Sequence, residues 1–161
     1  NRARLMIEVV DAAISVWGSD RVGLHISPGD REHNMLSGDN TADYVYLMRE
    51  MSKRNIAFVC SRETQAKDAW IGDKLRQAFN GTYIANEELS FELAVETLQK
   101  GRADAVAFGR AFIANPDLPE RFRLRAPLSE SDQATYYTPG PAGYIDYPAF
   151  TGTQHEISHA V

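Results

Sequence analysis

Apolar positions recur along the chain with two different spacings, and the change from one to the other separates helices from strands. Residues 2–17 carry apolar side chains three and four positions apart, which predicts a helix that Gly18 ends. Its apolar stripe is wide and is expected to pack on a sheet. The stripe consists of Leu5, Val9, Ala12 and Val16, with Met6, Val10, Ala13 and Trp17 beside them. Residues 21–27 then predict a strand that stops at Pro28.

The same alternation continues through the rest of the chain. Helices are predicted over residues 41–54, 70–79 and 91–100, and strands over residues 56–60 and 82–85 and over the apolar run from Ala103 that ends in Gly109-Arg110. Ser90 is placed to cap the helix over 91–100, whose Val95 and Leu98 are expected to face inward, and Gly101 to end it. A loop then closes at Asn115-Pro116, a broken helix covers residues 116–125, and residues 127–161 form an extended tail.

Helices that alternate with strands through short connections predict parallel strands with crossover helices, and therefore an α/β fold. The strands are continuous apolar runs, as expected where both faces of a sheet are covered. Four such units are compatible with a doubly wound sheet and with half of a (β/α)8 barrel. Both place ligands at the carboxyl ends of the strands. Those ends carry Ser27-Pro28, Cys60-Ser61, Ala85-Asn86 and Gly109-Arg110.

Composition narrows the class of protein. The 161 residues suit one domain, and a net charge of −5 argues against nucleic-acid binding. No apolar run approaches the length of a membrane span, and no signal peptide is visible. Cys60 is the single cysteine, which excludes an internal disulfide and favours a cytoplasmic location. Because the sequence starts with Asn1 rather than methionine, we expect a piece of a longer polypeptide.

The Gly109-Arg110 pair is the strongest candidate for chemistry. A glycine lets an oxyanion approach the backbone, and a guanidinium holds the anion through two hydrogen bonds. Such a pair at a strand end therefore suits a phosphate. The alternative is a buried strand end whose arginine extends to solvent or pairs with a carboxylate.

Two further motifs are not expected to bind metal. His155-Glu156-Ile157-Ser158-His159 fits the His-Glu-x-x-His pattern of zinc proteases. It has no apolar face, and the sequence leaves no room for a third ligand downstream, so we expect a solvated tail. Residues 30–33, Asp-Arg-Glu-His, are expected to form a solvated loop.

Several stretches, taken together, resemble the C-terminal half of the Old Yellow Enzyme family of flavin-dependent ene-reductases, from residue 1 to about residue 150. They are Asn1–Arg4, Val9–Ala12, Trp17-Gly18, Arg21–Leu24, Ile26–Pro28, Ala107–Arg110, Ile113–Leu118 and Gly143–Pro148.

The resemblance implies a (β/α)8 barrel that binds FMN at its C-terminal mouth and reduces activated alkenes, small-molecule substrates, with NAD(P)H. This chain would supply strands five to eight within residues 1–126, followed by a tail over 127–161. A half-barrel leaves open strand edges and an exposed interior. We therefore expect it to work with an N-terminal half, in the same or a separate chain.

The resemblance also implies roles for individual residues. Gly109 and Arg110 match positions that hold the FMN phosphate, and His25, Ala85 and Asn86 match further cofactor contacts. Tyr137 matches an aromatic residue over the flavin's outer edge, near the substrate; packing within the tail is the alternative. The family's catalytic residues lie in the other half, so none is named here.

Three departures from the family pattern weaken the expected FMN site. His25 stands where the family keeps an arginine, which removes a fixed positive charge from the flavin's pyrimidine edge. Glu87 and Glu88 stand in the turn that carries glycine in the family, and would oppose a phosphate dianion. Cys60 replaces a histidine, and we expect an inert thiol. The departures keep two alternatives open: a flavin-independent isomerase or cyclase, and a non-catalytic subunit.

Overall fold

A computed structural model describes residues 2–28, 39–63 and 70–152 of the chain. It contains two compact units, Asn1–Ala107 and Phe108–Val161. Among the described residues, the first unit holds the sheet, four α-helices and a 3-10 helix, η1 (Ser19–Arg21). The second holds two short α-helices and the C-terminal tail.

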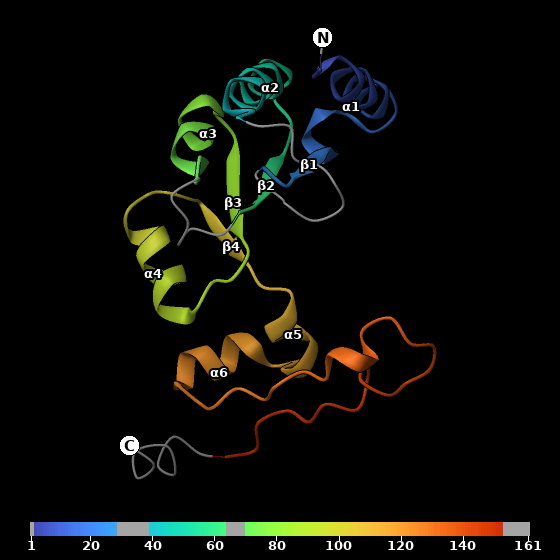
Figure 1. The fold of residues 1–161 in the computed structure, drawn as a ribbon, viewed down its shortest axis with the longest axis vertical. Helices are drawn as coiled ribbons and strands as arrows, with labels where there is room; N and C mark the ends of the chain where they lie inside the picture. The colour runs from blue at the N-terminus through green and yellow to red at the C-terminus, as the bar shows by residue number, and fades with distance from the viewer. Residues whose placement is uncertain (1, 29–38, 64–69, 153–161) are drawn as a thin grey trace. The chain divides into compact units, whose positions relative to one another are not determined.

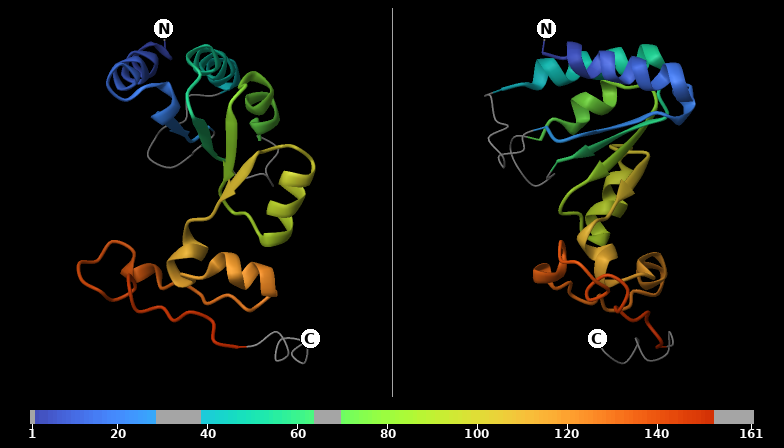
Figure 2. Two further views of the ribbon diagram at one scale, coloured as in Figure 1. Left: turned by 180° about the vertical axis from the view of Figure 1, so that it is seen from behind. Right: turned by 90° about the vertical axis from the view of Figure 1, so that its right-hand side faces the viewer.

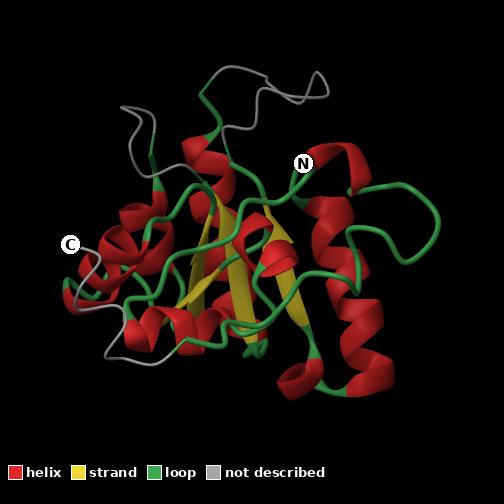
Figure 3. Ribbon diagram, turned by 90° about the horizontal axis from the view of Figure 1, so that it is seen from below, coloured by secondary structure: helices red, strands yellow, loops and turns green. Residues whose placement is uncertain are grey.

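The first unit contains a four-stranded parallel sheet (Figure 1; yellow in Figure 3). Its strands are β1 (Gly23–Ile26), β2 (Phe58–Arg62), β3 (Thr82–Asn86) and β4 (Ala105–Ala107), in the spatial order β1-β2-β3-β4. In a doubly wound sheet the strand order reverses at a switch point, whereas barrel strands follow one another in chain order. The sequential order therefore selects the half-barrel from the two folds that the sequence allowed.

Helices cover one face of this sheet (Figure 2). They are α1 (Arg4–Trp17), α2 (Thr41–Arg54), α3 (Gly72–Ala78) and α4 (Phe91–Gln99). Because side chains alternate along a strand, Val59 and Tyr83, which are paired in register, point to the same face. Both are fully buried in the apolar core that the helices form with the sheet. Residues of the opposite parity point to the other, open face, where Phe58 and His25 are exposed.

Most helix ends follow the predicted signals. Helix α2 has the predicted bounds, 41–54. Gly18 follows α1 at φ 82°, and its N–H donates to the Ile14 carbonyl at 2.9 Å. The Ser90 hydroxyl accepts a hydrogen bond from Leu93 N at 3.1 Å, which confirms it as the cap of α4. Gly101, at φ 65°, lies just beyond the end of that helix.

The prediction of which helix faces are buried was partly wrong. Within the wide stripe of α1, Val10 is buried, but Leu5, Val9 and Val16 are 71, 60 and 71% exposed. The helix instead packs through Val10 together with Ala3, Ile7, Ala13 and Ile14. In α4, Ala94 and Thr97 are buried while Leu98 is exposed. Apolar residues surround α1 so widely that spacing alone does not distinguish the packed face.

Two boundaries also differ in ways that matter for the site. Strand β2 runs two residues further than predicted and so includes Arg62. The loop predicted after Gly109-Arg110 is a short helix, α5 (Arg110–Ala114). The broken helix predicted over 116–125 is α6 (Leu118–Leu124), with Pro119 in its first turn.

In the second unit, a buried arginine fastens the tail to α6. The Arg121 guanidinium bonds to Asp117 at 2.8 Å and donates to the carbonyls of Pro127 and Pro148, both at 2.9 Å. It also lies over the Phe150 ring, 5.8 Å from its centroid. The tail is therefore anchored across the described residues 127–152, and it includes a short 3-10 helix, η3 (Gln133–Thr135), where the sequence predicted an extended segment throughout.

Across residues 2–28, 39–63 and 70–152, no helix has the length and apolar character of a membrane span. The cytoplasmic location and the domain division after residue 126 stay predictions.

Candidate functional site

The open face of the sheet carries the predicted cofactor residue His25 in a row with Cys60. His25 pairs in register with Cys60, Cys60 with Ile84, and Ile84 with Ala105. His25 is exposed and Cys60 is half-buried. Burial raises the pKa of the Cys60 thiol, which favours the protonated, unreactive form. This supports the interpretation of Cys60 as inert.

The next row on the open face lies at the carboxyl end of the strands. It contains Arg62, Asn86 and Ala107, which are paired in register across β2, β3 and β4. The Asn86 side-chain amide donates to the Ala107 carbonyl at 2.8 Å, so it ties the end of β3 to β4. Ala85 has the opposite parity and is buried on the helix side. Of the two predicted residues, Asn86 therefore faces the open side, and Ala85 offers a ligand only its main chain.

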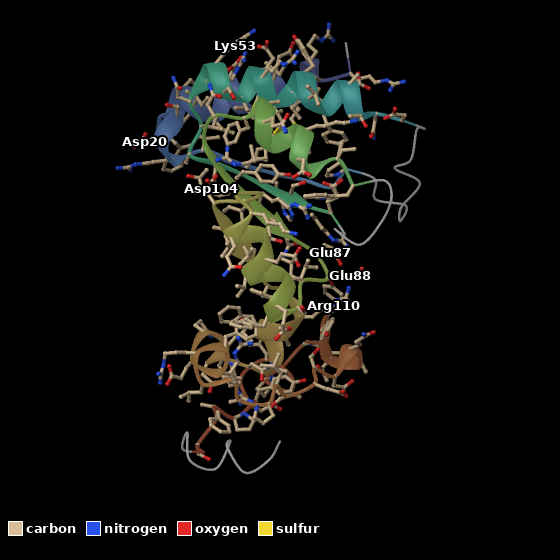
Figure 4. The ribbon with its side chains drawn as sticks, turned by 90° about the vertical axis from the view of Figure 1, so that its left-hand side faces the viewer. Asp20, Lys53, Glu87, Glu88, Asp104 and Arg110 are labelled. Atoms are coloured by element: carbon tan, nitrogen blue, oxygen red, sulfur yellow. The ribbon has the colours of Figure 1, made fainter. Side chains whose placement is uncertain are left out.

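Glu87 does not stand as an uncompensated negative charge at this end of the sheet. Its carboxylate accepts a hydrogen bond from Arg62 Nε in an ion pair. Figure 4 shows Glu87 and Glu88 in the turn after β3, at the opposite end of the sheet from Asp104. The adjacent guanidinium offsets the charge of Glu87 in this pair. That Glu87 weakens the binding of a phosphate stays a prediction.

The turn itself has an unusual backbone. Glu87 and Glu88 have φ values of 93° and 49°, in the left-handed region that glycine adopts most readily. The turn thus has a conformation suited to glycine even though glutamates occupy it. Such strain persists where the surrounding structure holds it. Here the Asn86–Ala107 hydrogen bond fixes the strand end before the turn, and Arg62 pairs with the Glu87 side chain.

A buried carboxyl group that the sequence did not single out follows β2. Glu63 is 8% exposed, and its Oε1 accepts a hydrogen bond from Ile71 N at 2.5 Å, just before α3. Its Oε2 and the hydroxyl oxygen of Ser61 are buried and have no hydrogen-bond partner among the residues that the structure describes. Burial raises the pKa of Glu63 to about 7. Glu63 lies in a polar stretch of the sequence, and no local pattern there indicates that its side chain is buried.

The second unit holds Gly109 and Arg110, and both are exposed. Gly109 has φ −95° and immediately precedes α5. A Cβ added there would meet nothing within 4 Å. Neither backbone conformation nor packing therefore requires glycine at this position, which leaves open space on the backbone for a ligand.

Tyr137, in the same unit, is 98% exposed. Its ring makes an edge contact with Tyr136, with centroids 6.5 Å apart and planes at 82°. The ring therefore contacts the tail through Tyr136 and is otherwise exposed. Its role beside a substrate stays a prediction.

The two motifs with possible metal ligands lie outside the described residues. They are the His155–His159 motif and residues 30–33. Among the residues that the structure does describe, no cluster of three or more His, Cys, Asp or Glu could hold a metal ion.

Comparison with known proteins gives a consistent result. The model of the NADH:flavin oxidoreductase / NADH oxidase family matches residues 1–128. The chain is 38% identical to 12-oxophytodienoate reductase 2 of Arabidopsis thaliana, with 95% of the chain and 43% of that protein aligned. It is 37% identical to a protein of Leishmania infantum named as a probable flavin mononucleotide-dependent alkene reductase, over 92% of the chain and 41% of that protein.

Solved structures agree. Morphinone reductase in complex with tetrahydroNAD superposes with a TM-score of 0.87 and is 41% identical, over 93% of this chain and 41% of that one. The Old Yellow Enzyme of Trypanosoma cruzi also gives 0.87, at 35% identity over 92% and 40%. The resemblance and the partial barrel predicted from the sequence are thereby confirmed. The chain spans about two fifths of the length of these proteins.

Proposed function

The chain belongs to the NADH:flavin oxidoreductase / NADH oxidase family, and from this premise we propose that it forms part of an FMN-dependent oxidoreductase that reduces activated alkenes with NAD(P)H. The observation that carries the proposal is the family match over residues 1–128, which include all four strands and Gly109-Arg110. The alkene-reductase name of the Leishmania infantum relative supports the reaction class. The tetrahydroNAD complex of morphinone reductase supports a nicotinamide reductant.

The residues present fit a flavin phosphate. In the second unit, the space beside the Gly109 backbone admits an oxyanion where a Cβ would otherwise stand. In the first unit, Arg62 pairs with Glu87 and supplies a positive charge at the carboxyl end of the strands. When bound, FMN supplies the capacity to accept a hydride and pass it on. In this proposal Gly109 and Arg110 bind the phosphate, as the resemblance implies.

The proposal includes an N-terminal barrel half as the partner of this chain. The exposed apolar residues of α1 support it: Leu5, Val9 and Val16 form an apolar stripe on the surface. Exposed apolar patches mark sites of contact with another protein surface. The open face of the sheet, with Phe58 exposed, is a second surface of this kind. We call this chain together with that half the completed protein. The groups that hold the substrate oxygen and donate the proton are assigned to the other half, in line with the resemblance.

Turnover tests the proposal. The completed protein, supplied with FMN, is expected to oxidise NADPH or NADH in proportion to added 2-cyclohexenone under anaerobic conditions. Arg110→Ala should lose FMN and this activity together, while Arg123→Ala, on the exposed side of α6, should keep both. If alkene-dependent oxidation is absent from protein that holds FMN, the ene-reductase proposal is wrong. An isomerase activity that needs no FMN would favour the flavin-independent alternative.

A further inference from the structure

Arg62 is the one lysine or arginine among the residues of β1, β2, β3 and β4. It lies two residues beyond Cys60, so both side chains point to the open face on which His25 lies. In register it stands beside Asn86, at the carboxyl end of the strands. A fixed cation therefore remains on this face although position 25 holds a histidine.

The guanidinium of Arg62 already faces an oxyanion, the carboxylate of Glu87. The side chains are 36% and 16% exposed, so the pair is accessible from solvent at its Arg62 side. Glu87 reaches it from the left-handed turn after β3, and the Asn86–Ala107 hydrogen bond fixes the strand end from which that turn starts. The geometry that receives a carboxylate also suits a phosphate, which offers more acceptor oxygens and more charge.

We propose that Arg62 binds the phosphate of the flavin and that Glu87 occupies its guanidinium when no phosphate is present. The proposal rests on the proposed function for the identity of the ligand. The carboxyl ends of parallel strands are where α/β folds bind ligands, and Arg62 is the fixed cation that the sheet places there. Glu87 is then an internal competitor of the phosphate, so the two residues have opposite effects on affinity.

The test compares FMN with riboflavin, which lacks the phosphate, by quenching of flavin fluorescence on the completed protein. Arg62→Gln should weaken FMN binding about tenfold or more and leave riboflavin almost unchanged, because a charged hydrogen bond to phosphate is lost. Glu87→Gln should tighten FMN binding by about two- to fivefold, as expected for release of a partly exposed ion pair. Glu88→Gln is the matched control: it removes the same charge from the neighbouring residue and should change neither affinity.

Two results would overturn the assignment. One is an equal effect of Arg62→Gln on FMN and riboflavin. The other is an equal effect of Glu87→Gln and Glu88→Gln, which would reflect net charge alone. If the wild-type protein binds neither flavin, the proposed function is wrong. Titration with inorganic phosphate then tests separately whether Arg62 binds an anion. A phosphate-dependent shift of the Arg62 Nε–Hε resonance, identified by its loss in Arg62→Gln, supports the anion site, whereas no shift refutes it.

Discussion

At the scale of single residues, burial and pairing decide the chemistry more than residue type does. Glu63 and Glu87 follow neighbouring strands, yet one is buried with an unpartnered oxygen and the other is paired with an arginine. Burial raises the pKa of Glu63 to about 7, whereas Arg62 pairs with Glu87 and offsets its charge. The two glutamates therefore have different consequences for stability and for binding.

The raised pKa of Glu63 predicts a pH dependence of stability. A carboxyl whose pKa is higher in the folded state, here about 7 against 4.5, stabilises the fold fully below pH 4.5, and that contribution is lost as the pH rises through 7. Since a tenfold change in proton affinity corresponds to about 1.4 kcal/mol, the loss is about 3 kcal/mol. Glu63→Gln is expected to remove this loss, as judged by urea unfolding of the completed protein at pH 5 and pH 8. An unchanged difference between the two pH values in the variant would contradict the assignment to Glu63.

The sequence pointed to some of these residues and not to others. Gly109-Arg110 could be singled out because a glycine and an arginine at a strand end are adjacent in the sequence. The Arg62–Glu87 pair could not, since it depends on the register between β2 and β3 and on two left-handed residues. The burial of Glu63 depends on how the start of α3 approaches the sheet, which no local pattern records.

At the scale of elements, Arg121 holds the tail of the second unit. Its partners come from α6 and from two distant points of the tail, so one side chain fixes three segments. Asn115 adds a second attachment: its side chain both donates to the Ser129 carbonyl, at 3.1 Å, and accepts from Ser129 N, at 2.8 Å. A tail rich in Pro, Gly, Ser and Thr has little apolar surface to bury, so polar contacts of this kind take its place.

Replacement of Arg121 should therefore release the tail. Arg121→Met leaves Asp117 and two carbonyls without their partner, and should lower the free energy of unfolding by about 3 kcal/mol or more. Arg123→Met is the matched control on the same helix; Arg123 is exposed and pairs only locally with Glu120, so its loss should be below about 1 kcal/mol. Chemical denaturation measures both, and limited proteolysis should cut residues 127–152 faster in Arg121→Met alone. Equal effects of the two variants would show that Arg121 is not the anchor.

The sequence predicted which helices and strands exist better than it predicted which face of a helix is buried. The bounds of α2 and the stops at Gly18 and Gly101 follow from local signals that act within one turn. The packed face of α1 does not, because apolar residues lie on several of its sides. Whether Leu5 or Ile7 faces the sheet is decided by the position of the neighbouring strand and helix, which lie far away in the sequence.

At the scale of the whole molecule, the chain has the surfaces of a part rather than of a complete barrel. The strands of its parallel sheet follow one another in chain order. The chain covers two fifths of its solved relatives, and its helix α1 exposes an apolar stripe. The alternation of helices and strands was enough to predict the α/β class. The choice of a barrel needed the observed strand order, and the half-barrel interpretation needed the family resemblance.

The stripe on α1 gives a test of the partner. When this chain and the N-terminal half are produced as separate polypeptides, we expect them to associate through this stripe. The double replacement Leu5→Asp and Val9→Asp should weaken association at least tenfold, because two exposed apolar side chains become charged at the interface. Glu8→Gln, on the same helix, serves as the control and should have a small effect, because Glu8 is exposed and pairs only weakly with Arg4. Calorimetric titration measures both, and unimpaired binding by the double aspartate variant would exclude this face as the contact.

The visible absorption spectrum of the completed protein shows whether this half-barrel contributes to an FMN site. The protein is incubated with FMN, excess flavin is removed by gel filtration, and the spectrum is recorded before and after addition of NAD(P)H without oxygen. We expect a retained flavin spectrum that the nicotinamide bleaches. A colourless protein after gel filtration would contradict an FMN site in the completed protein.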